Sequence, residues 1–180
     1  MRLLSAFCAI CLALLSAPRA RAEGALIEVG RAIVWEKSSD GLSYDSQVPW
    51  TGRVGWGFYD LDALVEYATF SKVDGEAGGE IGVTERQASV WARKTFASSF
   101  FAKPYVGAGL GARWESVRTR FLDQEETSYG RPRWLGAISG GAMVPIGVGF
   151  VGELEARFTS SPGYAPNPQL SASALLGYRF

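Results

Sequence analysis

Glu153 and Glu155 are two carboxylates placed two residues apart, and their type and spacing could support acid–base chemistry. In glycoside hydrolysis one carboxyl group protonates the leaving oxygen, while a second activates water or attacks the sugar. The alternative is a structural network of ion pairs, because arginines recur in the neighbouring segments of the chain. The sequence favours the ion pairs, and we expect no catalytic residue.

Other catalytic and ligand-binding chemistry is limited by composition. Histidine is absent from all 180 residues, which removes histidine general bases and histidine metal ligands. The glycines of Gly107-Ala-Gly109-Leu-Gly111-Ala112 match a dinucleotide-binding pattern, but that motif needs a helix after it. Here the strand-like alternation continues into Arg113. We therefore expect no cofactor and no metal site.

The first 22 residues have the features of a signal peptide. Arg2 precedes an apolar stretch over 3–15, and Ala20 and Ala22 fit the cleavage positions. This apolar stretch is too short to span ~30 Å of hydrocarbon. We predict cleavage after Ala22 and a mature domain over 23–180, without Cys8 and Cys11.

The predicted mature chain is slightly acidic, with 15 basic and 18 acidic residues. This balance is not that of a nucleic-acid-binding protein, and we expect no nucleic-acid partner. No later run of 18 apolar residues predicts a membrane-spanning helix.

Eight segments of the mature chain alternate apolar and polar residues with a period of two, which indicates β-strands. Each is long enough for the ~9–11 residues that cross a bilayer at a tilt. The predicted strands are 25–36, 50–59, 62–72, 82–96, 103–118, 133–144, 148–159 and 169–180. Long polar segments over 37–49, 73–81, 119–132 and 160–168 alternate with short turns. This alternation is typical of an outer-membrane barrel, with turns in the periplasm and loops outside.

Each predicted strand has one apolar face and one face of glycine, serine and charged residues. A charge facing lipid near the midplane costs about 2–4 kcal/mol, so the charged face is expected to line the lumen. Arg31 faces lipid if the first strand runs unbroken through Gly30, and faces inward if Gly30 forms a bulge. Both remain open. The predicted lumen ion-pair network comprises Glu28, Arg53, Glu66, Arg93, Arg113, Glu115, Glu153, Glu155, Arg157 and Arg179.

Two segments, KPYVGAGLGARWE over 103–115 and the terminal LLGYRF, resemble the family of small OmpA-like eight-stranded outer-membrane β-barrel domains. This family also includes surface antigens and OmpW-like barrels. The resemblance implies an all-β, eight-stranded antiparallel up-and-down transmembrane barrel. It also implies that Leu176, Tyr178 and Phe180 form the signal recognised by the barrel-assembly machinery.

We therefore expect a monomeric protein in the outer membrane of a Gram-negative bacterium, in contact with outer-membrane lipid. Its expected role is structural or surface-interacting, through exterior loops and a packed charged lumen. The alternative is a narrow channel for small solutes. Four arginines flanking the third loop are candidates for contact with lipopolysaccharide phosphates: Arg118, Arg120, Arg131 and Arg133.

Overall fold

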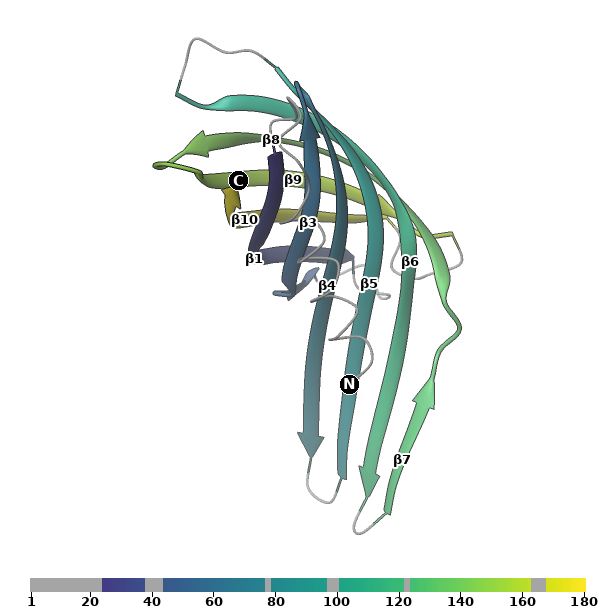
Figure 1. Ribbon diagram of the computed structural model, residues 1–180. Coiled ribbons are helices and arrows are strands. Elements are labelled where there is room, and N and C mark those ends of the chain that lie inside the picture. Colours follow the sequence, from purple (N-terminus) through teal and green to yellow (C-terminus); the bar gives the residue numbers. More distant parts are fainter. Residues whose placement is uncertain (1–23, 38–43, 77–78, 97–100, 122–123, 163–167) are drawn as a thin grey trace.

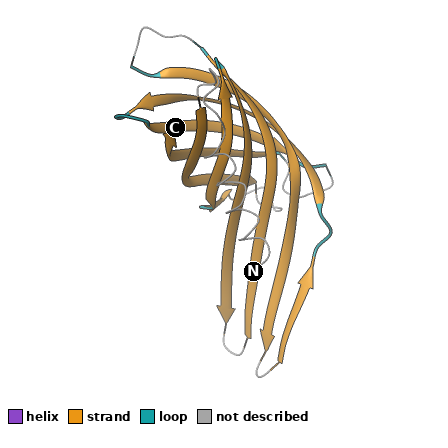
Figure 2. Ribbon diagram, in the orientation of Figure 1, coloured by secondary structure: helices purple, strands orange, loops and turns teal. Residues whose placement is uncertain are grey.

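The computed structural model describes residues 24–37, 44–76, 79–96, 101–121, 124–162 and 168–180, which form ten β-strands (Figures 1 and 2). The predicted signal peptide lies outside these residues and stays a prediction. Among the described residues there is no helix long and apolar enough to span a membrane. The strands are β1 (Gly24–Lys37), β2 (Tyr44–Gln47), β3 (Trp50–Phe58), β4 (Leu61–Glu76), β5 (Gly79–Thr95), β6 (Lys103–Phe121), β7 (Gln124–Tyr129), β8 (Arg133–Pro145), β9 (Phe150–Ser160) and β10 (Gln169–Arg179).

Eight long antiparallel strands close into a barrel. Their order is β10-β9-β8-β6-β5-β4-β3-β1, and β1 pairs back with β10 from Leu26↔Arg179 to Trp35↔Leu170. Closure leaves no free edge along the barrel wall, which is the condition for a sheet that crosses lipid. The predicted eight-stranded antiparallel barrel is confirmed.

The structure corrects the predicted exterior loops. The segment 73–81 is mostly strand, because β4 continues to Glu76 and β5 begins at Gly79. The first and third predicted loops contain β2 and β7, which pair with the outer ends of β1 and β6. Within the predicted loop 73–81, Asp74 pairs with Ile81 and Gly75 with Glu80, and next to it Ser71 Oγ and Thr84 Oγ1 form a hydrogen bond at 3.0 Å.

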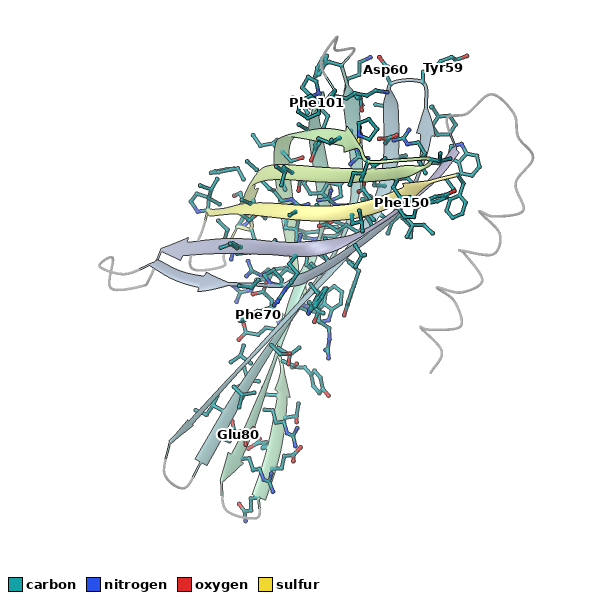
Figure 3. All side chains as sticks on the ribbon, turned by 90° about the vertical axis from the view of Figure 1, so that its left-hand side faces the viewer. Tyr59, Asp60, Phe70, Glu80, Phe101 and Phe150 are labelled. Atoms are coloured by element: carbon teal, nitrogen blue, oxygen red, sulfur yellow. The ribbon has the colours of Figure 1, made fainter. Side chains whose placement is uncertain are left out.

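The outer ends of four neighbouring strands extend well beyond the rest of the barrel (Figure 1). We call this part the protruding sheet, formed by residues 70–76, 79–86, 114–121 and 124–129 of β4, β5, β6 and β7. In Figure 3, Glu80 lies toward its far end, whereas Tyr59, Asp60 and Phe150 lie at the opposite, turn-side end of the barrel. The turn side therefore carries short connections and the other side the extended hairpins.

The barrel wall has its apolar residues outside and its polar residues inside. Val65, Leu110 and Leu154 are exposed on the outer wall, while the interior holds a small apolar cluster around Trp91. Gly109 makes room for this tryptophan, since a Cβ there would lie 2.5 Å from Trp91 Cδ2. Small residues thus allow large side chains to cross the lumen.

Arg31 lies on the outer wall. Gly30 pairs with Leu175 and with Thr51, and Arg31 pairs with Trp50, so the first strand runs through without a bulge. The exposed Arg31 guanidinium donates from Nη2 to the Val48 carbonyl oxygen at 3.1 Å and lies over the Trp50 ring, 4.9 Å from its centroid. The question that the sequence left open is settled by this register.

Aromatic side chains mark both ends of the outer wall. At the turn side, the Tyr178 ring makes edge-to-face contacts with Phe150 and Phe180, at centroid distances of 5.0 and 4.8 Å. At the loop side, Trp50 and Trp134 are exposed. Such belts are typical of the two interfaces of a membrane barrel.

Candidate functional site

The barrel interior is crossed by a cluster of ion pairs centred on Arg53 of β3. Its Nε donates to Glu66 Oε2 at 2.7 Å, on the directly opposite residue of β4. Its Nη1 and Nη2 donate to Glu153 Oε1 at 2.5 Å and Glu155 Oε1 at 2.6 Å, both on β9. One guanidinium therefore connects strands from the first and last parts of the chain.

Arg93 of β5 forms the turn-side half of the cluster. Its Nη2 donates to Asp62 Oδ2 at 2.8 Å, its Nη1 donates to Glu28 Oε1 at 3.2 Å, and Nη1 also pairs with Glu153. The Asp62 carboxylate also accepts a hydrogen bond from Arg179 Nη2 at 3.2 Å. β10 is thereby joined to β4 and β5.

Arg157 of β9 forms the loop-side half. Its Nη1 donates to Glu66 Oε1 at 2.6 Å, and its guanidinium lies over the Trp91 ring at 4.2 Å from the centroid. Tyr105 of β6 completes the cluster by donating its hydroxyl to Glu153 Oε1 at 2.7 Å. The charged residues of the cluster therefore also contact two aromatic side chains, Trp91 and Tyr105.

The cluster is shut off from solvent. Glu66 is 0% and Arg53 3% exposed, and Glu28, Asp62 and Arg93 are each 2% exposed. Buried charges are tolerated only when they are paired and hydrogen-bonded. Glu153 and Glu155 both accept hydrogen bonds from Arg53 and Tyr105, so their arrangement suits ion pairs rather than an acid and base open to substrate.

The structure brings eight of the ten predicted network residues into this cluster. Arg113 forms a separate ion pair with Glu85, nearer the protruding sheet. Glu115 lies opposite Glu85 on the neighbouring strand, outside the cluster. The eight are Glu28, Arg53, Glu66, Arg93, Glu153, Glu155, Arg157 and Arg179.

Sequence reasoning missed Asp62, Tyr105 and Glu85. Each lies on the inward face of its strand, and the alternation itself was the available signal: Asp62 is four residues from Glu66, and Tyr105 is four residues from Gly109. Glu85 forms the ion pair with Arg113. Asp62 is the residue that holds both Arg93 and Arg179.

Two spaces lie on either side of the cluster. A cavity of about 40 Å³ on the loop side is lined by Thr51, Arg53, Arg157 and other polar residues, and a cavity of this size can hold ordered water. A pocket of about 700 Å³ opens at the turn side, lined by residues that include Met143 and Arg179. The cluster lies between them.

The four arginines proposed for lipopolysaccharide contact are all exposed near the loop side. Arg118 Nη2 donates to Glu125 Oε2 at 2.6 Å, and this hydrogen bond lowers the pKa of the Glu125 carboxyl. Arg120 lies opposite Glu80 and Glu125 in the protruding sheet. Arg131 precedes β8, and Arg133 lies opposite Arg113 at its first residue.

The three residues of the expected assembly signal lie along one face of β10. Leu176 and Phe180 are exposed on the outer wall, and Tyr178 packs between Phe150 and Phe180. The backbone N–H of Phe180 donates to the Ala25 carbonyl oxygen at 2.9 Å. The chain end is therefore held against the first strand.

Solved structures of other proteins share this architecture. No family model matches the chain, and no curated protein matches its sequence. Among solved structures, Neisserial surface protein A is similar over 88% of this chain and 99% of its own, with 18% identity and a TM-score of 0.69. This chain has the fold of the small outer-membrane β-barrels.

Other solved barrels agree with that assignment. The attachment invasion locus protein Ail of Yersinia pestis is 19% identical over 87% of this chain and 97% of its own, with a TM-score of 0.56. The N-terminal barrel domain of Pseudomonas aeruginosa OprF is 13% identical over 86% and 97%, with a TM-score of 0.55. The resemblance expected from the two sequence segments is confirmed at the level of the fold.

Proposed function

We propose that this protein is an integral outer-membrane barrel, exported by a signal peptide, that acts at the cell surface and not as an enzyme. The apolar outer wall, the aromatic residues at both ends and the likeness to outer-membrane barrels support the location. The observation that carries the role is the buried ion-pair cluster, because it fills the lumen and leaves the protruding sheet as the most accessible element.

The cluster also argues against the alternative of a narrow channel. A solute would have to pass Arg53, Glu66 and Glu153, whose charges are mutually paired and almost fully buried. Opening a path would break several ion pairs in a medium of low dielectric constant, where an unpaired charge is costly. We expect no stable unitary steps from the purified protein in a planar bilayer. Regular conductance steps would favour the channel and contradict a closed lumen.

The protruding sheet is the part of the molecule proposed to meet a partner. Every residue of β7 is exposed, and Tyr129 is 75% exposed. Ail, which shares this fold, has been solved in complex with the heparin analogue sucrose octasulfate, with a TM-score of 0.57 to this chain. Immobilised heparin and other sulfated polysaccharides are therefore suitable first probes.

The pairing register allows the protruding sheet to be shortened without changing the barrel. Phe70 pairs with Glu85 and Ser116 with Tyr129, so each pair can be closed by an Asn-Gly turn. We expect bacteria carrying this variant to assemble the barrel but to lose adherence to the probes. A Gly147→Ser variant in a turn-side connection, where a Cβ meets no atom within 4 Å, is the control. Unchanged adherence would contradict a surface role for the sheet.

The assembly signal and the lipopolysaccharide contact remain proposals with separate tests. We expect Phe180→Ala to reduce the amount of assembled barrel, whereas Leu154→Ala on the same outer wall leaves it unchanged; equal assembly of both would contradict the signal.

We expect glutamine at the four loop-side arginines to reduce co-purified lipopolysaccharide. An unchanged amount would contradict that contact at Arg118, Arg120, Arg131 and Arg133.

A further inference from the structure

The strand pairing places an arginine and two tryptophans on neighbouring strands of the outer wall, where the protruding sheet leaves the barrel. Arg86 of β5 pairs directly with Trp114 of β6, and both lie on the outward face. Two residues further into the barrel on β6, Ala112 lies opposite Trp134 of β8, which is 81% exposed. Tryptophan favours the membrane interface, so Arg86 lies at the depth where lipid headgroups are expected.

An apolar groove of about 750 Å³ runs along the same strands below Arg86. Its base is made of small residues, Ala92, Ala108 and Gly136, and its sides rise at Leu110 and Ile138. These two side chains are 67% and 62% exposed. A convex barrel wall therefore has a hollow in which almost every lining atom is apolar.

The cation and the groove are in line. Val90 and Leu110, which line the groove, are four residues along β5 and β6 from Arg86 and Trp114. At about 3.3 Å per residue this separates the cation from the groove by ~13 Å. One end of the surface thus suits an anion and the other an alkyl chain, which is the chemistry of an amphiphile.

We propose that this part of the wall binds one lipid with a net negative phosphate headgroup, with its phosphate at Arg86 and an acyl chain in the groove. A guanidinium forms charge-assisted hydrogen bonds with phosphate oxygens. The groove allows one alkyl chain to pack closely against its apolar side chains, which adds dispersion attraction. The proposal rests on the membrane location proposed above. It adds a specific lipid, whereas the rest of the outer wall contacts lipid without selection.

Arg31 shows why the pairing of cation and groove matters. It is another arginine on the outer wall beside a tryptophan, but its guanidinium is bound to the Val48 carbonyl oxygen and the Trp50 ring. The groove does not include residues of β1 or β3. Arg31 is therefore a matched control for the charge of Arg86.

The test uses the full mature protein, refolded into detergent micelles and titrated with single lipids under native mass spectrometry. We expect one phosphatidylglycerol to be retained roughly tenfold better than a phosphatidylcholine with the same acyl chains. Arg86→Gln should abolish this preference, and Arg31→Gln should leave it. Inorganic phosphate at the same concentration should not displace the lipid, since it offers no acyl chain.

The groove is tested by filling it. A Cβ at Gly136 meets only Leu110 Cδ2, at 3.7 Å, so Gly136→Leu is accommodated and occupies the groove; Gly140→Leu on the same outward face is the control. We expect Gly136→Leu to weaken retention of both lipids and Gly140→Leu to have no effect. Equal retention of both lipids by the wild type, or unchanged retention in Arg86→Gln and Gly136→Leu, would overturn the proposal. Insertion into vesicles, measured separately, reports on the membrane location itself.

Discussion

The barrel wall and the protruding sheet share β4, β5 and β6, but on β5 and β6 the apolar and polar residues exchange faces between the two regions. Within the barrel, β5 presents Val90 outward and Ser89 and Arg93 inward. In the protruding sheet the outward residues of β5 include Thr84, while Val83 lies on the inward face. The strand does not change its alternation; the residues that occupy each face change.

β6 repeats this exchange. Leu110 is exposed on the outer wall of the barrel, whereas Ser116 and Arg118 lie on the same face of the protruding sheet, with Val117 on the other. The simplest physical cause is a change of surroundings, from lipid outside the barrel wall to water around the sheet. The exchange begins at the Arg86–Trp114 pair, which therefore marks the expected membrane boundary.

The largest difference between the two regions is expected for ion pairs. Arg53→Met leaves Glu66, Glu153 and Glu155 without their shared guanidinium, and we expect a loss of about 3–5 kcal/mol in the free energy of unfolding. Arg118→Met removes an exposed pair with Glu125, and the loss should be far smaller because water screens a pair on the surface. Urea unfolding in vesicles measures both. Equal losses would show that the cluster is not a buried network.

A new charge on the outward face tests the boundary itself. Val65→Arg places a cation on the lipid-facing wall and should cost about 2–4 kcal/mol. Ser71→Arg lies on the same face of the same strand, six residues further out, and should cost less than about 1 kcal/mol because its surroundings are water. If both variants lose the same stability, the boundary does not lie between these positions.

A methyl group added on the lumen side of the barrel wall should lower stability more than one added on the outer side. Gly109→Ala would place its Cβ 2.5 Å from Trp91 Cδ2, and displacing a buried ring should cost about 1–3 kcal/mol. Gly136→Ala meets only Leu110 Cδ2 at 3.7 Å and should be close to neutral. The thermal unfolding midpoints of the two variants provide the measurement. A neutral Gly109→Ala would mean that the lumen is more loosely packed than the distance implies.

The smallest expected effect is a pH dependence confined to the protruding sheet. The hydrogen bond from Arg118 lowers the pKa of Glu125, so its stabilising contribution is present above the ordinary pKa of a glutamate, about 4.3, and is lost as the pH falls through the lowered pKa. We expect the protection of the β7 amides from hydrogen exchange, relative to the intrinsic exchange rate at each pH, to fall below that range and Glu125→Gln to remove the dependence. A profile that Glu125→Gln leaves unchanged would assign it to another group.

The sequence predicted the barrel well because period-two alternation depends directly on burial. All eight long strands and both faces follow from it. The same rule placed Glu115 on the inward face. It did not show that Glu115 lies too far towards the loop side of β6 to reach the cluster. The face on which a charged residue lies does not show which charged residues of other strands are at the same height in the barrel, because that height depends on the strand register.

The protruding sheet was harder to predict because its residues are polar. Gly75 and Glu80 lie in the segment predicted as a loop, yet they pair across the hairpin. Water surrounds this part of the sheet, so its alternation is weaker and the strand ends are set by pairing with neighbours. Arg31 was undecided for a related reason: only the partner residues Trp50 and Ala174 show that the strand is unbroken.

The ion-pair cluster has a consequence for the order of assembly. Arg53 is separated by 102 residues from Glu155 along the chain, and Arg179 by 117 from Asp62. These contacts cannot form until the last hairpin has met the first strand, so they are expected to be absent from the transition state for folding. Interactions of that kind slow unfolding without speeding folding. We therefore expect the cluster to form last during folding and mainly to lengthen the lifetime of the closed barrel by slowing its unfolding.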